Sequence, residues 1–138
     1  MQKTARKFTW NFLSGRFEYY TLPSGLAPFR EWRAGLTDVR TKAAIDARIA
    51  RMRGGNFGDS RPIGGGASES RIDFGPGFRI YYGRDDRKIV LLDGGDKSSQ
   101  SADIANALGF WNDYKKQKAA SEAKAKIQKG SAQRPKKR

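Results

Sequence analysis

The hydrophobic pattern changes its period along the chain, and this change constrains the fold more than any other feature. Four apolar residues first recur at helical spacing: Val39, Ile45, Ile49 and Met52. Apolar and polar residues then alternate over two later segments, residues 69–74 and 78–82. A period of two residues is typical of strands that bury one face. The chain is therefore expected to place its helices and strands in separate segments, which is an α+β pattern.

Three of the expected strands form an antiparallel meander. Gly75-Pro76-Gly77 predicts a turn between residues 69–74 and 78–82. A second turn leads into Ile89-Val90-Leu91-Leu92, which is apolar on both faces, as a central strand is. A further strand is predicted over residues 17–22, at the sheet edge, and residues 56–68 are predicted to be a loop.

Two helices are expected between the first strand and the meander. Pro28 favours the start of a short helix, because proline suits the first helical position. Thr37 or Asp38 can cap a second helix, which ends at Gly54-Gly55. A short connection makes the pair a helical hairpin. The predicted fold is a twisted antiparallel sheet with this N-terminal hairpin on one face and a C-terminal helix.

The last helix is predicted from Ser101 to Tyr114, with a continuation through an Ala/Lys-rich stretch to about Lys129. The chain then divides into three parts: a basic N-terminal extension (1–16), one folded domain (17–114) and a basic, partly helical or disordered tail (115–138).

The charge balance indicates a polyanionic partner. The chain has a net charge of +14, of which residues 115–138 carry +9 and the remaining 114 residues +5. Such an excess favours nucleic acid binding, although a solubilising tail explains the tail charge equally well. No apolar run is long enough to span a membrane, and no signal peptide is recognisable, so a cytoplasmic protein is expected.

The chain contains no cysteine and no histidine. Disulfides and thiolate metal sites are therefore excluded, and neither a metal site nor a cofactor is predicted. Catalysis, if the protein is an enzyme, has to use arginine, lysine, tyrosine or carboxylate groups, because the commonest base at neutral pH is missing.

The strand alternation predicts a polar face. If Ile72, Phe78 and Ile80 face the helices, the intervening residues face the other way: Glu69, Arg71, Asp73, Arg79 and Tyr81. Lys97 follows the last strand, and Arg61 precedes the meander, so both can reach this face. Gly94-Gly95-Asp96-Lys97 lacks the spacing of a phosphate-binding loop and is interpreted as a strand-to-helix connection.

These residue types suit cleavage of RNA by its own 2′-hydroxyl. Guanidinium groups stay charged and meet two phosphate oxygens at once, so Arg71 and Arg79 can stabilise the charge that develops on phosphorus. Lys97 or Tyr81 can act as acid or base if its surroundings tune it. The alternative interpretation is that the arginines and Glu69 are solvated cross-strand pairs without a catalytic role.

Three separated motifs resemble the toxins of the RelE/ParE superfamily, and most closely the HigB-like branch of addiction-module killer proteins. They are Gly-Asn-Phe-Gly-Asp at 55–59, Ser-Arg-Ile-Asp-Phe-Gly-Pro-Gly-Phe-Arg-Ile-Tyr-Tyr at 70–82, and Leu-Leu-Asp-Gly-Gly-Asp-Lys-Ser-Ser-Gln at 91–100. The resemblance spans roughly residues 17–114. Ser70 departs from it, since the family commonly has leucine there.

The resemblance implies a microbial RNase-like fold and the toxin of a type II toxin–antitoxin pair. Such a toxin is a metal-independent endoribonuclease that cleaves mRNA on the ribosome. Its partners are the ribosome, mRNA and an antitoxin of helix-turn-helix type. The expected catalytic residues are Arg71, Arg79, Lys97 and Tyr81, of which Tyr81 rests only on the face argument. Five further basic residues are expected to bind RNA: Arg48, Arg51, Arg61, Lys115 and Lys116.

Two other functions are compatible with the same resemblance. One is a ParE-like toxin that binds DNA gyrase and cleaves nothing. The other is an inactivated relative that still binds its antitoxin, which Ser70 and the missing C-terminal base (a tyrosine or histidine in some relatives) keep open.

Overall fold

The computed structural model describes residues 16–133, with side chains through Gln128. Most of the predicted N-terminal extension and residues 134–138 of the predicted tail lie outside the described residues. Nine elements follow one another along the chain: β1 (Arg16–Tyr19), α2 (Pro28–Ala34), α3 (Val39–Arg53), β2 (Asp59–Gly64), β3 (Ala67–Ile72), β4 (Phe78–Asp85), β5 (Lys88–Asp96), a 3-10 turn η1 (Lys97–Ser99) and α4 (Gln100–Gln133).

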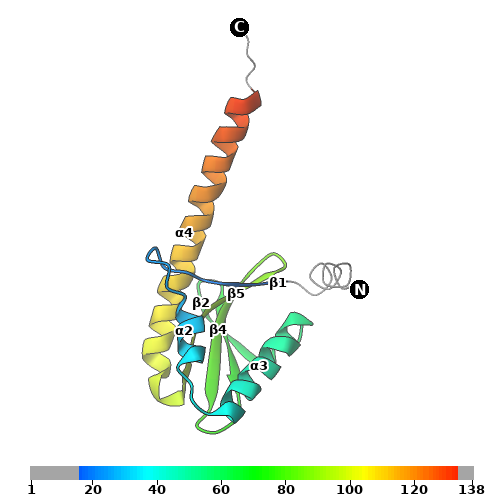
Figure 1. Cartoon of the computed structure of the whole chain (residues 1–138), viewed down its shortest axis with the longest axis vertical. Helices are drawn as coiled ribbons and strands as arrows, with labels where there is room; N and C mark the ends of the chain where they lie inside the picture. The colour runs from blue at the N-terminus through cyan, green and yellow to red at the C-terminus, as the bar shows by residue number, and fades with distance from the viewer. Residues whose placement is uncertain (1–15, 134–138) are drawn as a thin grey trace.

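One five-stranded sheet in the order β1-β5-β4-β3-β2 forms the centre of the molecule (Figure 1). The α+β class and the antiparallel meander β3-β4-β5 are confirmed. The sheet is mixed, however, because β1 runs parallel to β5, so the prediction of a wholly antiparallel sheet is wrong. The predicted loop at 56–68 is also wrong, since it contains β2, an edge strand paired with β3.

The predicted helical hairpin covers one face of the sheet. Pro28 opens α2, and the Asp38 side chain caps α3 by accepting from the backbone N–H groups of Arg40 and Thr41. The buried core on this face joins residues of both helices to three strands. Its members are Phe29, Ile45, Met52, Ile72, Phe78, Ile80, Tyr82, Ile89 and Leu91. The inward-facing positions that the alternation predicted for β3 and β4 are therefore confirmed.

The first half of α4 covers the opposite face. Its core residues Ala107, Trp111 and Tyr114 pack with Tyr81 and Val90 of the sheet. Glycines allow this close approach: a Cβ added to Gly83 would lie 2.4 Å from the Trp111 ring. On the hairpin side, a Cβ added to Gly94 would lie 2.1 Å from the Trp32 ring. Packing against a helix therefore explains the glycine in each strand.

Beyond Tyr114, α4 continues as one helix to Gln133 and projects from the domain (Figure 1). Lys118 marks where it leaves, because its ammonium group pairs with Asp85 at 2.6 Å. From Ala119 to Gln128 every residue is exposed. No helix in the described part of the chain is both long and apolar enough to cross a membrane.

Candidate functional site

A groove of about 450 Å³ lies beside the β3–β4 turn and brings four cationic side chains together. They come from separate parts of the sequence: Arg48 from α3, Arg71 from β3, Arg79 from β4 and Lys97 from η1. The turn Gly75-Pro76-Gly77 forms part of the wall. Such a concentration of guanidinium and ammonium groups in a concave site suits a phosphate group.

Two carboxylates, Asp59 and Asp73, line the same groove. Both residues are exposed. They offer hydrogen-bond acceptors beside the four cations, so the groove can hold a ligand that carries donors as well as phosphate oxygens.

Arg48 is anchored at the base of the groove by its own hydrogen bonds. Its Nη1 donates to Ser70 Oγ at 2.9 Å and to the Arg71 carbonyl oxygen at 2.7 Å. Ser70 is completely buried and its hydroxyl donates to the Phe57 carbonyl oxygen. The small polar residue at position 70 therefore accommodates a guanidinium group. Gly58 leaves room for the same group, since a Cβ there would lie 2.5 Å from the guanidinium.

Arg71 and Arg79 face each other across β3 and β4 in direct register. The Arg79 side chain is only 5% exposed, whereas that of Arg71 is 31% exposed. The buried carboxylate of Glu69 lies beside both, with Oε2 4.0 Å from Arg71 Nε and Oε1 3.8 Å from Arg79 Nε. Gln100, the first residue of α4, donates from Nε2 to both oxygens of Glu69, at 3.1 and 3.3 Å.

Tyr81 does not belong to the groove. It shares a face with Arg79, as predicted, but α4 covers this part of the sheet and Tyr81 is completely buried. Burial, then the negative charges of Glu69 and Asp103, raise the pKa of the hydroxyl above its ordinary value. The expectation that Tyr81 lies on an open face is therefore wrong, because the alternation identifies a face and not what covers it.

Two further carboxylates, Asp93 of β5 and Asp103 of α4, lie close together where α4 begins. Burial raises the pKa of Asp93 to about 6, while the nearby charge of Asp103 acts in the same direction. The Gly94 N–H donates to Asp93 and opposes the shift. Asp103 accepts a short hydrogen bond from the Ser99 hydroxyl, and a Cβ on Gly95 would lie 1.8 Å from Asp103 Oδ2. The Asp103 side chain therefore packs the first turn of α4 directly against Gly95 of β5.

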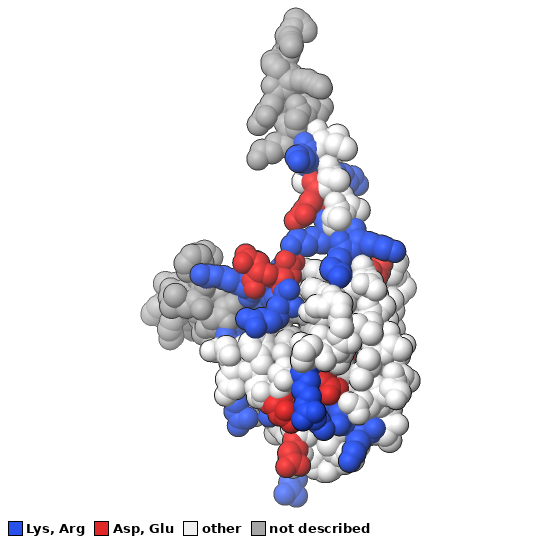
Figure 2. Space-filling model, turned by 180° about the vertical axis from the view of Figure 1, so that it is seen from behind, with Lys and Arg blue, Asp and Glu red and all other residues white. Residues whose placement is uncertain are grey.

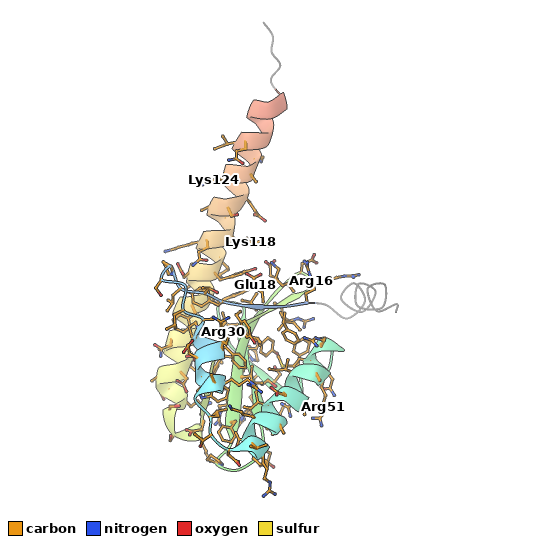
Figure 3. All side chains as sticks on the ribbon, in the orientation of Figure 1. Arg16, Glu18, Arg30, Arg51, Lys118 and Lys124 are labelled. Atoms are coloured by element: carbon orange, nitrogen blue, oxygen red, sulfur yellow. The ribbon has the colours of Figure 1, made fainter. Side chains whose placement is uncertain are left out.

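None of the other residues expected to bind RNA lines the groove. Arg61 is exposed on the edge strand β2, 3.8 Å from Asp59. Arg51 lies on the outer side of α3 (Figure 3). Lys115 donates to the Gly65 carbonyl oxygen, and Lys116 is exposed on α4. The structure therefore groups Arg48, Arg71, Arg79 and Lys97 and leaves the rest dispersed.

Basic and acidic side chains lie close together on the body of the molecule, whereas the projecting half of α4 is mainly basic (Figure 2). Among residues 115–128, five lysines accompany a single acid, Glu122. Lys116, Lys124 and Lys126 form no ion pair or hydrogen bond with any other described residue, and Lys124 points away from the domain (Figure 3).

Sequence reasoning missed two contributors to this region. It placed Glu69 on the correct face but gave it no role, and it did not single out Gln100. The alternation could have identified Glu69, because it places this carboxylate on the same face of the sheet as Arg71 and Arg79. Two neighbouring positive charges on one face need a counter-charge. Gln100 could not be found in this way, since its contact spans 31 positions in the sequence.

Comparison with known proteins identifies one informative relative. The chain is 45% identical over 80 residues to an uncharacterized protein of Haemophilus influenzae, and the match covers 57% of this chain and 81% of that protein. No protein-family model matches the chain, and no solved structure matches it.

Proposed function

The chain belongs to the same family as this uncharacterized Haemophilus influenzae protein, and we propose that it is a ribosome-dependent endoribonuclease, the toxin of a type II toxin–antitoxin pair with a RelE-like fold. The observation that carries the proposal is the groove, where Arg48, Arg71, Arg79 and Lys97 meet from four separate segments. Its support from the sequence is the resemblance of three motifs to RelE/ParE toxins. The ribosome as target would make the cytoplasm its place of action.

The proposed reaction needs no group beyond the RNA and side chains of this kind. The 2′-oxygen forms a bond to the adjacent phosphorus, the bond from phosphorus to the 5′-oxygen breaks, and a cyclic phosphate and a 5′-hydroxyl result. A base takes the 2′-proton, and an acid returns a proton to the leaving oxygen. Arg71 and Arg79 stabilise the charge on the phosphoryl oxygens. Lys97 is the candidate acid, and Asp59 and Asp73 are candidate bases.

The basic half of α4 has a separate part in this proposal. Its lysines, Lys115 and Lys116 among them, lie about four helical turns or more beyond Gln100, the groove end of α4. We assign them to the phosphate backbone of ribosomal RNA, which a protein bound in the decoding site meets on several sides. This assignment concerns affinity and not the chemical step.

A second candidate function is binding without cleavage, as in the gyrase-directed relatives. Two observations favour it: Arg79 is buried, and Tyr81 does not line the groove. Both reduce the number of accessible side chains that could take part in cleavage. Under this alternative, growth arrest would occur while mRNA stays intact.

The deciding experiment is induction of the protein in bacterial cells, with mRNA 5′ ends mapped within minutes. The proposal predicts new 5′ ends in phase with codons and their loss in Arg71→Ala, with growth restored. Arg16→Ala is a matched control, because it removes one exposed arginine from the far edge strand. Arrest without new 5′ ends would support the binding alternative, and full toxicity of a folded Arg71→Ala protein would refute the assigned site.

A further inference from the structure

The two arginines at the centre of the groove are held in an unfavourable arrangement. Arg71 and Arg79 occupy directly opposite positions on β3 and β4. Like charges directly opposite each other on adjacent strands repel. The repulsion is not relieved by water at Arg79, whose side chain is 5% exposed and whose Nε has no hydrogen-bond partner among the described residues. Something has to keep both guanidinium groups in place.

Glu69 is placed to do this. Its side chain is 5% exposed, and each of its two oxygens lies beside the Nε atom of a different arginine. Arg79 Nη1 donates to the Gly77 carbonyl oxygen at 3.5 Å. Because Nε lies on one side of a guanidinium group, a carboxylate held there still leaves terminal N–H groups of both arginines for another anion. A single buried carboxylate thus lies against both guanidinium groups and attracts each of them from its Nε side.

Glu69 is held in turn by α4. A buried carboxylate needs hydrogen-bond donors, and Gln100 supplies its amide to both oxygens. Gln100 is the first residue of α4, and three residues later the Asp103 carboxylate packs against Gly95 of β5, where an added Cβ would lie 1.8 Å from its Oδ2. The helix start therefore determines where the carboxylate sits, and the carboxylate determines where the arginines sit.

We propose that Glu69 is a positioning residue for Arg71 and Arg79, and that Gln100 fixes Glu69. This inference rests on the proposed function for its chemical meaning, because a guanidinium group stabilises a phosphoryl group best when its terminal nitrogens are aligned in advance. Loss of the carboxylate should therefore lower the rate of the chemical step. It should not weaken RNA binding, because one negative charge is removed beside the phosphate.

The test uses the purified full-length chain and ribosomes carrying a defined mRNA, with kcat and KM measured separately. Glu69→Gln is expected to lower kcat by about 10- to 100-fold, up to the roughly 100-fold loss that a misplacement of 1 Å causes, while KM stays the same or falls. Gln100→Glu places a second carboxylate against Glu69 and should also lower kcat. The double variant Glu69→Gln, Gln100→Glu restores one amide and one carboxylate, and should recover at least about tenfold over Glu69→Gln.

Glu31→Gln on α2 is the control for net charge, because it removes one exposed carboxylate that does not line the groove. Thermal unfolding of every variant establishes the folded fraction. If Glu69→Gln does not unfold cooperatively, Gln100→Glu carries the test alone, since Gln100 is only half-buried. A folded Glu69→Gln or Gln100→Glu protein with wild-type kcat would overturn the positioning role, as would a double variant no better than Glu69→Gln.

The positioning role can also be tested if the proposed function is wrong. If the wild-type protein does not cleave ribosome-bound mRNA, the positioning role is read from the Nε–H resonances of arginine by NMR. The wild-type protein should show distinct resonances for Arg71 and Arg79, which shift in Glu69→Gln and return in the double variant. Resonances unchanged by Glu69→Gln would overturn the positioning role independently of any activity.

Discussion

Replacing Asp93 by asparagine should stabilise the protein at neutral pH and leave its stability unchanged in acid. Asp93 lies on β5 opposite Tyr81, and burial raises its pKa to about 6. An unfolded aspartate has a pKa of about 3.9. Folding at pH 7 therefore has to keep a carboxylate charged where the protein favours its neutral form.

The sign and size follow from this difference. A group whose pKa is raised in the folded state contributes stability that is fully present below about pH 4 and lost above about pH 6. Each pKa unit corresponds to about 1.4 kcal/mol, so ionisation of Asp93 weakens the folded state by about 2–3 kcal/mol at pH 7. Asparagine is uncharged throughout and keeps an oxygen that can accept from the Gly94 N–H.

The assay is urea unfolding of the wild-type and Asp93→Asn proteins between pH 4 and pH 8. The variant should be more stable by about 2–3 kcal/mol at pH 7, and the difference should vanish near pH 4. Asp86→Asn, in the exposed β4–β5 turn, is the control for loss of one surface carboxylate. A gain of equal size at both pH values, or a less stable Asp93→Asn protein at pH 7, would refute the reasoning.

Two further predictions test packing and RNA affinity. Gly94→Ala should destabilise the fold by about 1–3 kcal/mol in urea unfolding, because the added methyl group meets the Trp32 ring, whereas Gly109→Ala on α4 meets nothing and should be neutral or stabilising. Replacing Lys116, Lys124 and Lys126 together by glutamine should make ribosome binding less dependent on salt, lowering the slope of log K against log salt by up to about 2–3. An unchanged slope would show that these lysines contact no phosphate.

The elements with strong local signals could be predicted from the sequence. Asp38 caps α3 as expected, because a side-chain acceptor before an apolar helical stripe is a local signal. The alternation through β3 and β4 placed Arg71 and Arg79 on one face, as a period of two residues requires. These predictions depend only on residues a few positions apart.

The missed elements depend on contacts between distant segments. β2 contains Arg61, Pro62 and Gly64, and its burial pattern does not alternate, because an edge strand tolerates proline and exposed polar groups. The parallel pairing of β1 with β5 joins residues more than 70 positions apart. The cover over Tyr81 comes from Trp111 and its neighbours on α4. Helical periodicity identified Trp111 as a core residue but not the sheet face that it packs against.

On the proposed function, the distribution of charge gives the two basic regions different parts in RNA binding: the lysines of α4 attract RNA, and the groove orients it. In the groove, four cations are accompanied by Asp59, Asp73 and the buried Glu69, so its net charge is small. Long-range attraction for RNA would then come mainly from the exposed lysines of α4, which have a single acid among them. On the proposed function, loss of those lysines should raise KM and weaken its salt dependence. Changes at Glu69 should lower kcat without raising KM, since Glu69 acts on the direction in which the two guanidinium groups of the groove point.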